Sequence, residues 1–157
     1  MDFLRGYREK QEPGQEGEPI RFIASTEGIG RDGYVIEASG WDLENYRKNP
    51  VVLWGHDYMG QRLPIGKAEV EVKGKQLVAD VMFDQQDQFA RDIESKYRRG
   101  FLNAVSVGWD TLEVRPPKDG KPPVIIRAEL LDVSGVPVGG DPDALAAREA
   151  RALIALS

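Results

Sequence analysis

The chain has 157 residues, of which 41% are hydrophobic and 30% charged, and its formal net charge is −5. This length and composition are typical of one globular domain with a core of its own, and a negative charge without a basic block argues against nucleic-acid binding. The absence of cysteine excludes disulfides, thiolate-bound zinc and a cysteine nucleophile. No apolar run approaches the roughly 20 residues of a membrane span, and no signal peptide opens the chain, so we expect a cytoplasmic protein.

The first 19 residues are polar, acidic and rich in Gly and Pro. Such a stretch buries too little surface to offset its ordering entropy, so we expect a flexible tail over 1–19 and a single domain over 20–157. The hydrophobic pattern of the following residues predicts short strands, one helical turn stopped by Pro50 and a hairpin. These lie at IRFIAST (20–26), GIGRDGYVI (28–36), DLENYRKNP (42–50), VVLWGH (51–56) and PIGKAEVEVKGKQLVADVMF (64–83).

A clear helix is predicted over DQQDQFARDIESKYRRG (84–100). Asp84 is the expected N-cap, and Asp87 adds a negative charge to the first turn. Gly100 suits the C-terminal cap, after a basic last turn. One apolar face is expected from side chains spaced four apart, which are Phe89, Ile93 and Tyr97.

Two further strands are predicted, over 101–114 and 124–138, separated by a proline-rich loop. After a glycine turn, Asp141 as N-cap and Pro142 at the first helical position predict an alanine-rich C-terminal helix. The fold class that follows is mainly β with α: an antiparallel sheet, curled or closed like a barrel, with one inserted helix and one C-terminal helix.

His56 is the only histidine of the chain, and it ends a compact hydrophobic strand. A lone histidine serves as a catalytic base, a metal ligand or a hydrogen-bonded structural residue. A metal site is disfavoured because neither a second histidine nor a cysteine exists, so we expect no metal and no organic cofactor. The base role requires a nucleophile.

Ser106 is the serine whose surroundings fit a nucleophile best. It lies between Val105 and Val107 in LNAVSVGW, so it shares a strand face with the small residues Ala104 and Gly108. That face leaves room for a substrate backbone or an imidazole. The alternative is a small residue that fills a crowded interior.

A third group should orient the imidazole, and RAELLDVSGV carries two acids. Glu129 and Asp132 differ by an odd number, so on a regular strand they face opposite sides, and periodicity alone does not choose between them. Either acid is also compatible with a solvated place on a strand edge. Asp57 is a further candidate, although neighbours on an extended strand point apart.

Three sequence blocks resemble those of the tailed-phage prohead proteases, which are related in fold to the herpesvirus assemblins. The blocks occur in one order within about residues 20–148 and read NPVVLWGHD…PIGKA, GFLNAVSVGW and ELLDVSGVPVGGDPDA. The resemblance implies a serine endopeptidase of capsid maturation, with Ser106 as nucleophile and His56 as base. It favours Asp132 as the third member, with Glu129 as the alternative, because this chain lacks the second histidine of assemblins.

The resemblance also implies substrates, surroundings and an assembly. The substrates are scaffold and major capsid proteins, and the chain itself, cleaved inside the immature prohead in the bacterial cytoplasm. Gly139 and Gly140 replace bulkier family residues, and their N–H groups are the expected oxyanion donors. Assemblins act as dimers, and the apolar face of the C-terminal helix suits either a homodimer interface or docking on its own sheet.

Two other functions fit the same residues. One is a catalytically silent scaffold or capsid-assembly factor on this fold, although such a chain is free to lose His56 or Ser106 and this one keeps both. The other is a non-peptidase serine hydrolase, such as an esterase. The chain has neither the G-x-S-x-G elbow nor the strand–helix alternation of the common esterase fold.

Overall fold

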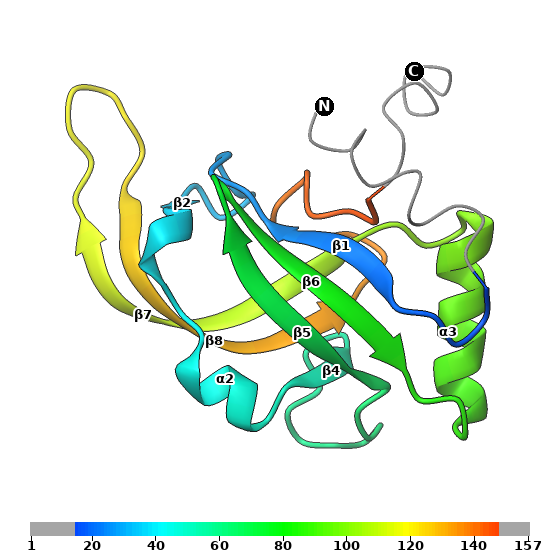
Figure 1. Ribbon diagram of the computed structural model, residues 1–157. Helices are drawn as coiled ribbons and strands as arrows, with labels where there is room; N and C mark the ends of the chain where they lie inside the picture. The colour runs from blue at the N-terminus through cyan, green and yellow to red at the C-terminus, as the bar shows by residue number, and fades with distance from the viewer. Residues whose placement is uncertain (1–14, 148–157) are drawn as a thin grey trace.

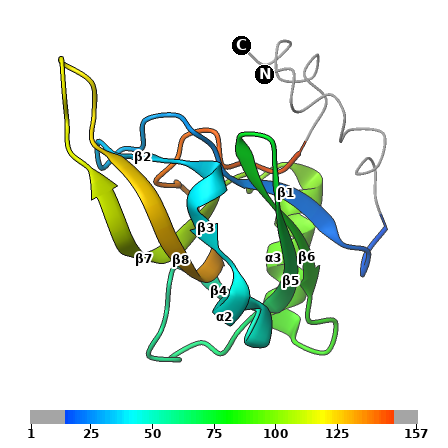
Figure 2. The same ribbon diagram turned by 60° about the vertical axis from the view of Figure 1, so that its left-hand side comes forward.

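A curled, eight-stranded mixed sheet dominates the computed structural model, which describes residues 15–147 (Figures 1 and 2). The strands are β1 (Ile20–Ser25), β2 (Val35–Ile36), β3 (Trp41–Asp42), β4 (Val51–Trp54), β5 (Gly66–Lys73), β6 (Gln76–Phe83), β7 (Val105–Arg115) and β8 (Val124–Gly135). The helices are the 3₁₀ turn η2 (Ala38–Gly40), α2 (Glu44–Lys48) and α3 (Gln88–Arg99). The expected class, mainly β with α in a barrel-like sheet, is confirmed.

Strand β8 pairs with four other strands of the sheet. It pairs antiparallel with β7, and the tip of this long hairpin projects from the body (Figure 1). Its other edge pairs in parallel with β2, β3 and β4 in turn. The antiparallel pairs β1–β6, β5–β6 and β4–β5 complete the order β1-β6-β5-β4-β8-β2. The parallel pairings were not part of the sequence prediction, and they bring the end of β4 beside the end of β8.

The expected C-terminal helix is wrong for residues 144–147, and residues 148–157 lie outside the described part. Asp141 does not cap a helix, because residues 142–147 form a turn and two bridges. Its carboxylate accepts hydrogen bonds from the Thr26 N–H and hydroxyl at 2.7 and 2.8 Å and from the Asp143 N–H at 2.9 Å. Residues 144–147 instead bridge β1 and the start of β7, through Ile23 N–H to Leu145 O and Val105 N–H to Ala144 O, both 3.0 Å. Unpaired strand edges favour this pairing over a helix.

Helix α3 begins later than predicted. Its N-cap is Asp87, whose carboxylate accepts from the Phe89 N–H at 3.2 Å. Asp84 belongs to the preceding turn, because its N–H still bonds the Ile65 carbonyl at 2.9 Å and continues the sheet. Gly100 caps the other end with φ of 85°, as expected.

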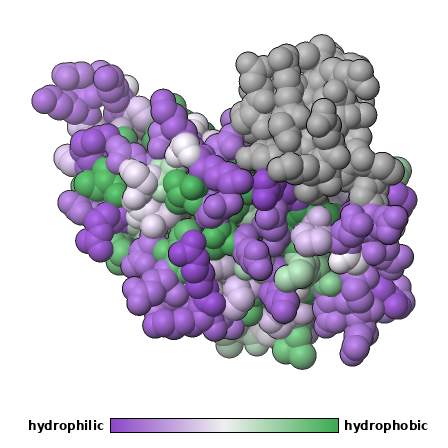
Figure 3. Space-filling view, viewed as in Figure 1, coloured by the Kyte–Doolittle hydropathy of each residue, from purple (hydrophilic) through white to green (hydrophobic). Residues whose placement is uncertain are grey.

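The core lies inside the curled sheet, and side chains of α2 and α3 belong to it. Ile93 and Tyr97 are buried and Phe89 packs against them, so the predicted apolar face of α3 is confirmed. The rings of Tyr97 and of Phe22 in β1 pack edge to face, with their centroids 4.9 Å apart. The face seen in Figure 3 is mainly hydrophilic, with scattered hydrophobic side chains. No helix within residues 15–147 is long and apolar enough to span a membrane.

Of the predicted 1–19 tail, the structure describes residues 15–19. They form a turn in which the Glu18 N–H bonds the Gln15 carbonyl at 3.0 Å. The Gly17 N–H donates to the buried Glu94 carboxylate of α3 at 2.9 Å. This end of the segment is therefore tied to the domain.

Candidate active site

His56 lies in a tight turn directly after β4. Both Gly55 and His56 have positive φ, 63° and 56°, a conformation that costs a residue with a side chain free energy. Two hydrogen bonds to the end of β8 hold it: the His56 N–H donates to Ser134 Oγ at 3.0 Å, and the Gly55 N–H donates to the Gly135 carbonyl at 2.9 Å. The parallel β4–β8 pairing thus fixes the imidazole over β8.

The imidazole contacts Asp132. His56 Nδ1 lies 3.1 and 3.2 Å from the two Asp132 carboxylate oxygens, and the Asp132 side chain is buried. Glu129 is directed elsewhere, where its carboxylate accepts from Asn45 Nδ2 at 3.3 Å. The structure therefore places Asp132, and not Glu129, at the ring. Asp57 caps the backbone N–H groups of Gly60 and Arg62 in the following loop.

Three donors keep Asp132 ionised. Burial by itself raises the pKa of this carboxyl, but hydrogen bonds from His56, Ser134 and Tyr58, together with the His56 charge, outweigh it and lower the pKa below its usual value. The Ser134 and Tyr58 hydroxyls each donate at 2.5 Å. Asp132 is therefore a buried anion that holds a histidine ring, an arrangement that orients and stabilises an imidazolium.

Ser106 lies on the face of the β7–β8 ladder that carries Asp132. It is paired directly with Ser134, and Gly108 is paired with Asp132; directly paired residues of antiparallel strands point to the same side. Proton transfer between a serine and a histidine requires an approach to about 2.6–3.2 Å, somewhat looser without substrate, and within residues 15–147 no hydrogen bond joins Ser106 to His56. Such catalytic contacts are often long before substrate binds.

Exposure separates the two paired serines. Ser134 is buried, donates to Asp132 and accepts from the His56 N–H. Ser106 is only partly buried and lines a cavity of about 40 Å³. Ser25, Asp32 and Gly140 also line this cavity. Solvent therefore reaches Ser106 and not Ser134.

The turn at Gly139–Gly140 passes beside Ser106. A Cβ on Gly140 would lie 3.9 Å from Ser106 Oγ, and one on Gly139 would lie 2.7 Å from the Val105 carbonyl oxygen. Arg31 holds the turn, since its N–H donates to the Gly140 carbonyl at 2.8 Å and its guanidinium to the Gly139 carbonyl. Within the described part of the chain, neither glycine N–H donates a hydrogen bond. The turn that carries these two N–H groups therefore lies next to Ser106.

Sequence reasoning missed Tyr58. It follows His56 by two residues in DYMG, a loop-like stretch with no periodicity, so only the folded loop reveals its contact with Asp132. Among the described residues, no group of three or more His, Asp or Glu side chains is arranged to hold a metal ion.

The chain resembles a known protein along most of its length. It is 32% identical over 123 residues to the prohead protease of Escherichia phage T5, a match that covers 76% of this chain and 57% of that protein. This similarity supports the family that the three sequence blocks predict, and the chain spans little more than half the length of this relative. No family model matches the chain. No solved structure matches it either.

Proposed function

We propose that this chain is a serine endopeptidase of phage prohead maturation, with Ser106 as nucleophile, His56 as general base and Asp132 as the acid that orients the base. The observation that carries the proposal is the contact of His56 Nδ1 with a buried, ionised Asp132 beside an accessible serine on the same sheet face. The similarity to the T5 prohead protease supports the same reaction class.

The Asp132 contact sets the tautomer of the base. A proton on Nδ1 is held by the carboxylate, so Nε2 is left as the proton acceptor. When substrate closes the gap, Nε2 takes the Ser106 Oγ proton as the oxygen attacks the scissile carbonyl. The imidazolium then gives this proton to the leaving amine, and a water molecule hydrolyses the acyl-enzyme by the same steps in reverse order.

Gly139 and Gly140 are the proposed oxyanion donors. Their N–H groups carry no hydrogen bond within the described residues, and the turn adjoins Ser106. Arg31 binds both carbonyls, and its contact with the Gly139 carbonyl holds the peptide plane that carries the Gly140 N–H. Each preorganised donor of this kind typically lowers the activation free energy by about 2.7–4 kcal/mol.

The proposed substrates are scaffold and major capsid proteins, together with the chain itself, cleaved inside the immature prohead in the host cytoplasm. The cavity beside Ser106 is the proposed site for a substrate side chain next to the scissile bond. No metal or organic cofactor is needed for this chemistry, and a homodimer stays a proposal.

A serine-reactive phosphonate probe with intact-mass detection tests the function. We expect one adduct, mapped to the peptide that contains Ser106, and loss of the adduct in S106A and H56A. S39A is the matched control, because Ser39 is exposed and lies on η2, away from the site. If the probe does not label the wild-type chain and the chain still binds capsid protein, the silent assembly factor is supported. If the probe labels the chain and the chain cleaves esters but not peptides, another hydrolase is supported.

A further inference from the structure

We propose that Tyr58 is a positioning residue: together with Ser134 it clamps the two oxygens of Asp132 and so sets how strongly this carboxylate acts on His56. The inference rests on the proposed function for its catalytic meaning. The clamp itself is a claim about hydrogen bonding, and it is measurable in a chain without activity.

The clamp has one donor for each carboxylate oxygen. The Tyr58 hydroxyl donates to Oδ1 and the Ser134 hydroxyl to Oδ2, both at 2.5 Å, while the His56 ring lies within 3.2 Å of both. Charge-assisted hydrogen bonds of this length are strong and directional. A carboxylate held at both oxygens cannot rotate away from the ring.

Gly108 makes room for the Tyr58 hydroxyl. A Cβ at position 108 would lie 2.0 Å from Tyr58 Oη and 2.1 Å from Asp132 Oδ1, far inside any tolerated contact. The small face around Ser106, which the sequence suggested as room for a substrate or an imidazole, is therefore filled at Gly108 by this hydrogen bond. The same space excludes every other residue type at position 108 while the contact exists.

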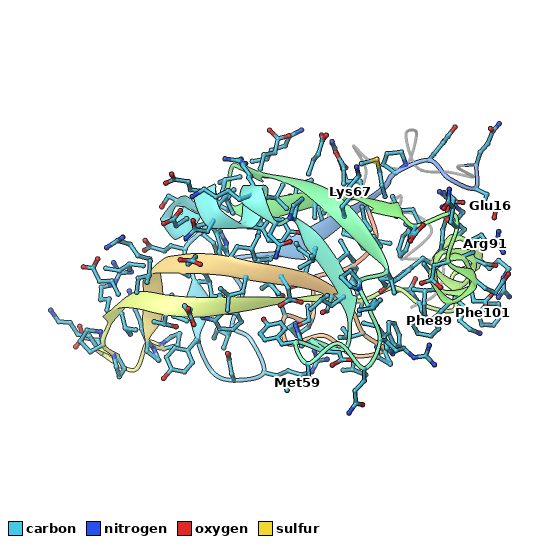
Figure 4. All side chains as sticks on the ribbon, turned by 90° about the horizontal axis from the view of Figure 1, so that it is seen from below. Glu16, Met59, Lys67, Phe89, Arg91 and Phe101 are labelled. Carbon is cyan, nitrogen blue, oxygen red and sulfur yellow. The ribbon has the colours of Figure 1, made fainter. Side chains whose placement is uncertain are left out.

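Core packing does not account for the position of Tyr58. The residue is 56% exposed, and its neighbour Met59 is 89% exposed and lies at the outer rim of the molecule in Figure 4. Only the hydroxyl end reaches inward. Asp57 shapes the loop through the Gly60 and Arg62 N–H groups at 3.1 and 2.8 Å. The loop is built to present a hydroxyl to Asp132.

The hydroxyl is a dependable donor. Burial of its end and the hydrogen bond to Asp132 raise the pKa of Tyr58 above its usual value, so it stays protonated at neutral pH. Among the described residues, the carboxylate charge of Asp110 on β7 also acts on Tyr58, and Tyr46 on α2 is a neutral phenol whose pKa burial and the Asp132 charge raise. Each donor takes up part of the carboxylate charge. Without Tyr58, Asp132 is a stronger partner for the imidazolium, and its orientation is less constrained.

The test is Y58F, which removes only the hydroxyl, measured by NMR titration of His56 in the untagged S106A background. His56 is the only histidine of the chain, so its ring proton signal needs no assignment. We expect its titration midpoint to move to higher pH in Y58F by several tenths of a unit or more. M59L, a change at the exposed neighbour, is the matched control and should leave the midpoint unchanged. An unchanged midpoint in Y58F overturns the clamp.

Kinetics of the active chain give the second readout. In Y58F we expect kcat to fall about tenfold or more, KM to stay within about twofold, and the acid limb of the pH profile to move upward with the midpoint. If the wild type neither cleaves nor binds the phosphonate, the proposed function fails, while the NMR midpoint still decides the clamp. A fall in kcat with an unmoved midpoint and acid limb overturns the positioning role.

Discussion

His56 Nδ1 and Asp132 Oδ2 meet at 3.1 Å although 76 residues separate them in the chain. The contact exists because β4 runs parallel to β8, with Trp54 paired to Gly135, and the turn after Trp54 folds the ring back along β8. Asp132, three residues before Gly135, is the acid within reach. The pair comprises the proposed base and its proposed partner, and the first two predictions test their roles with Ser106.

Removal of the nucleophile should abolish proteolysis of a scaffold or capsid substrate. S106A deletes one partly exposed hydroxyl that has no hydrogen bond to His56, so stability should change by no more than about 0.5 kcal/mol. H56A should lose nearly as much activity, and the double variant little more, because nucleophile and base act as a unit. Cleavage assays with purified variants check this. Residual wild-type cleavage by S106A would move the nucleophile elsewhere.

Substitution of Asp132 and of Glu129, the two acids of β8, should have very different effects on activity. In D132N the amide no longer fixes the Nδ1 proton, and we expect kcat to fall by up to about 10⁴, the loss measured for the equivalent change in the chymotrypsin-type triad. E129Q should stay within about twofold of wild type, since Glu129 contacts Asn45 and not the ring. Steady-state kinetics on both variants decide the assignment. The reverse pattern would make Glu129 the third member.

Acid should destabilise the wild type through Asp132. The pKa of this carboxyl is lower in the folded chain than in the unfolded one, so it contributes stability above the unfolded value of about 3.9. That stability is lost as pH falls through the folded pKa. Urea unfolding between about pH 5 and 2 should show a steeper loss in wild type and E129Q than in D132N. Equal slopes in all three chains would contradict the lowered pKa.

Gly139 and Gly140 differ in the space available for a side chain, so their alanine variants should differ in stability. G139A puts a methyl group 2.7 Å from the Val105 carbonyl oxygen, next to Ser106, and the backbone there must shift. We expect a loss of about 1–3 kcal/mol in unfolding free energy and reduced activity. In G140A the nearest atom is at 3.9 Å, so its stability should match wild type. Thermal melts of the two variants compare them directly.

The sequence by itself determined the elements whose signals are local. The hairpin β5–β6, helix α3 with Gly100 as its cap, the strand that leads to His56 and the strand that carries Ser106 all follow from periodicity and turn residues. The candidates for nucleophile and base were also visible, because the chain has a single histidine and a serine on a face of small residues. These features depend on near neighbours along the chain, and near neighbours are what a sequence pattern records.

Tertiary structure decided what depends on pairing between distant segments. Alternation could not choose between Asp132 and Glu129, and the β7–β8 register shifts between Gly108 and Trp109, so regular alternation does not hold there. The contact of Tyr58 with Asp132 needed the loop after β4 to meet β8. Residues 144–147 bridge two strands although their composition favours a helix, because two open strand edges offered hydrogen bonds that local propensity could not match. Contacts between residues far apart in the chain leave no periodic pattern in the sequence. The hydrogen bonds and packing that favour these contacts form only when the strands pair in the folded sheet.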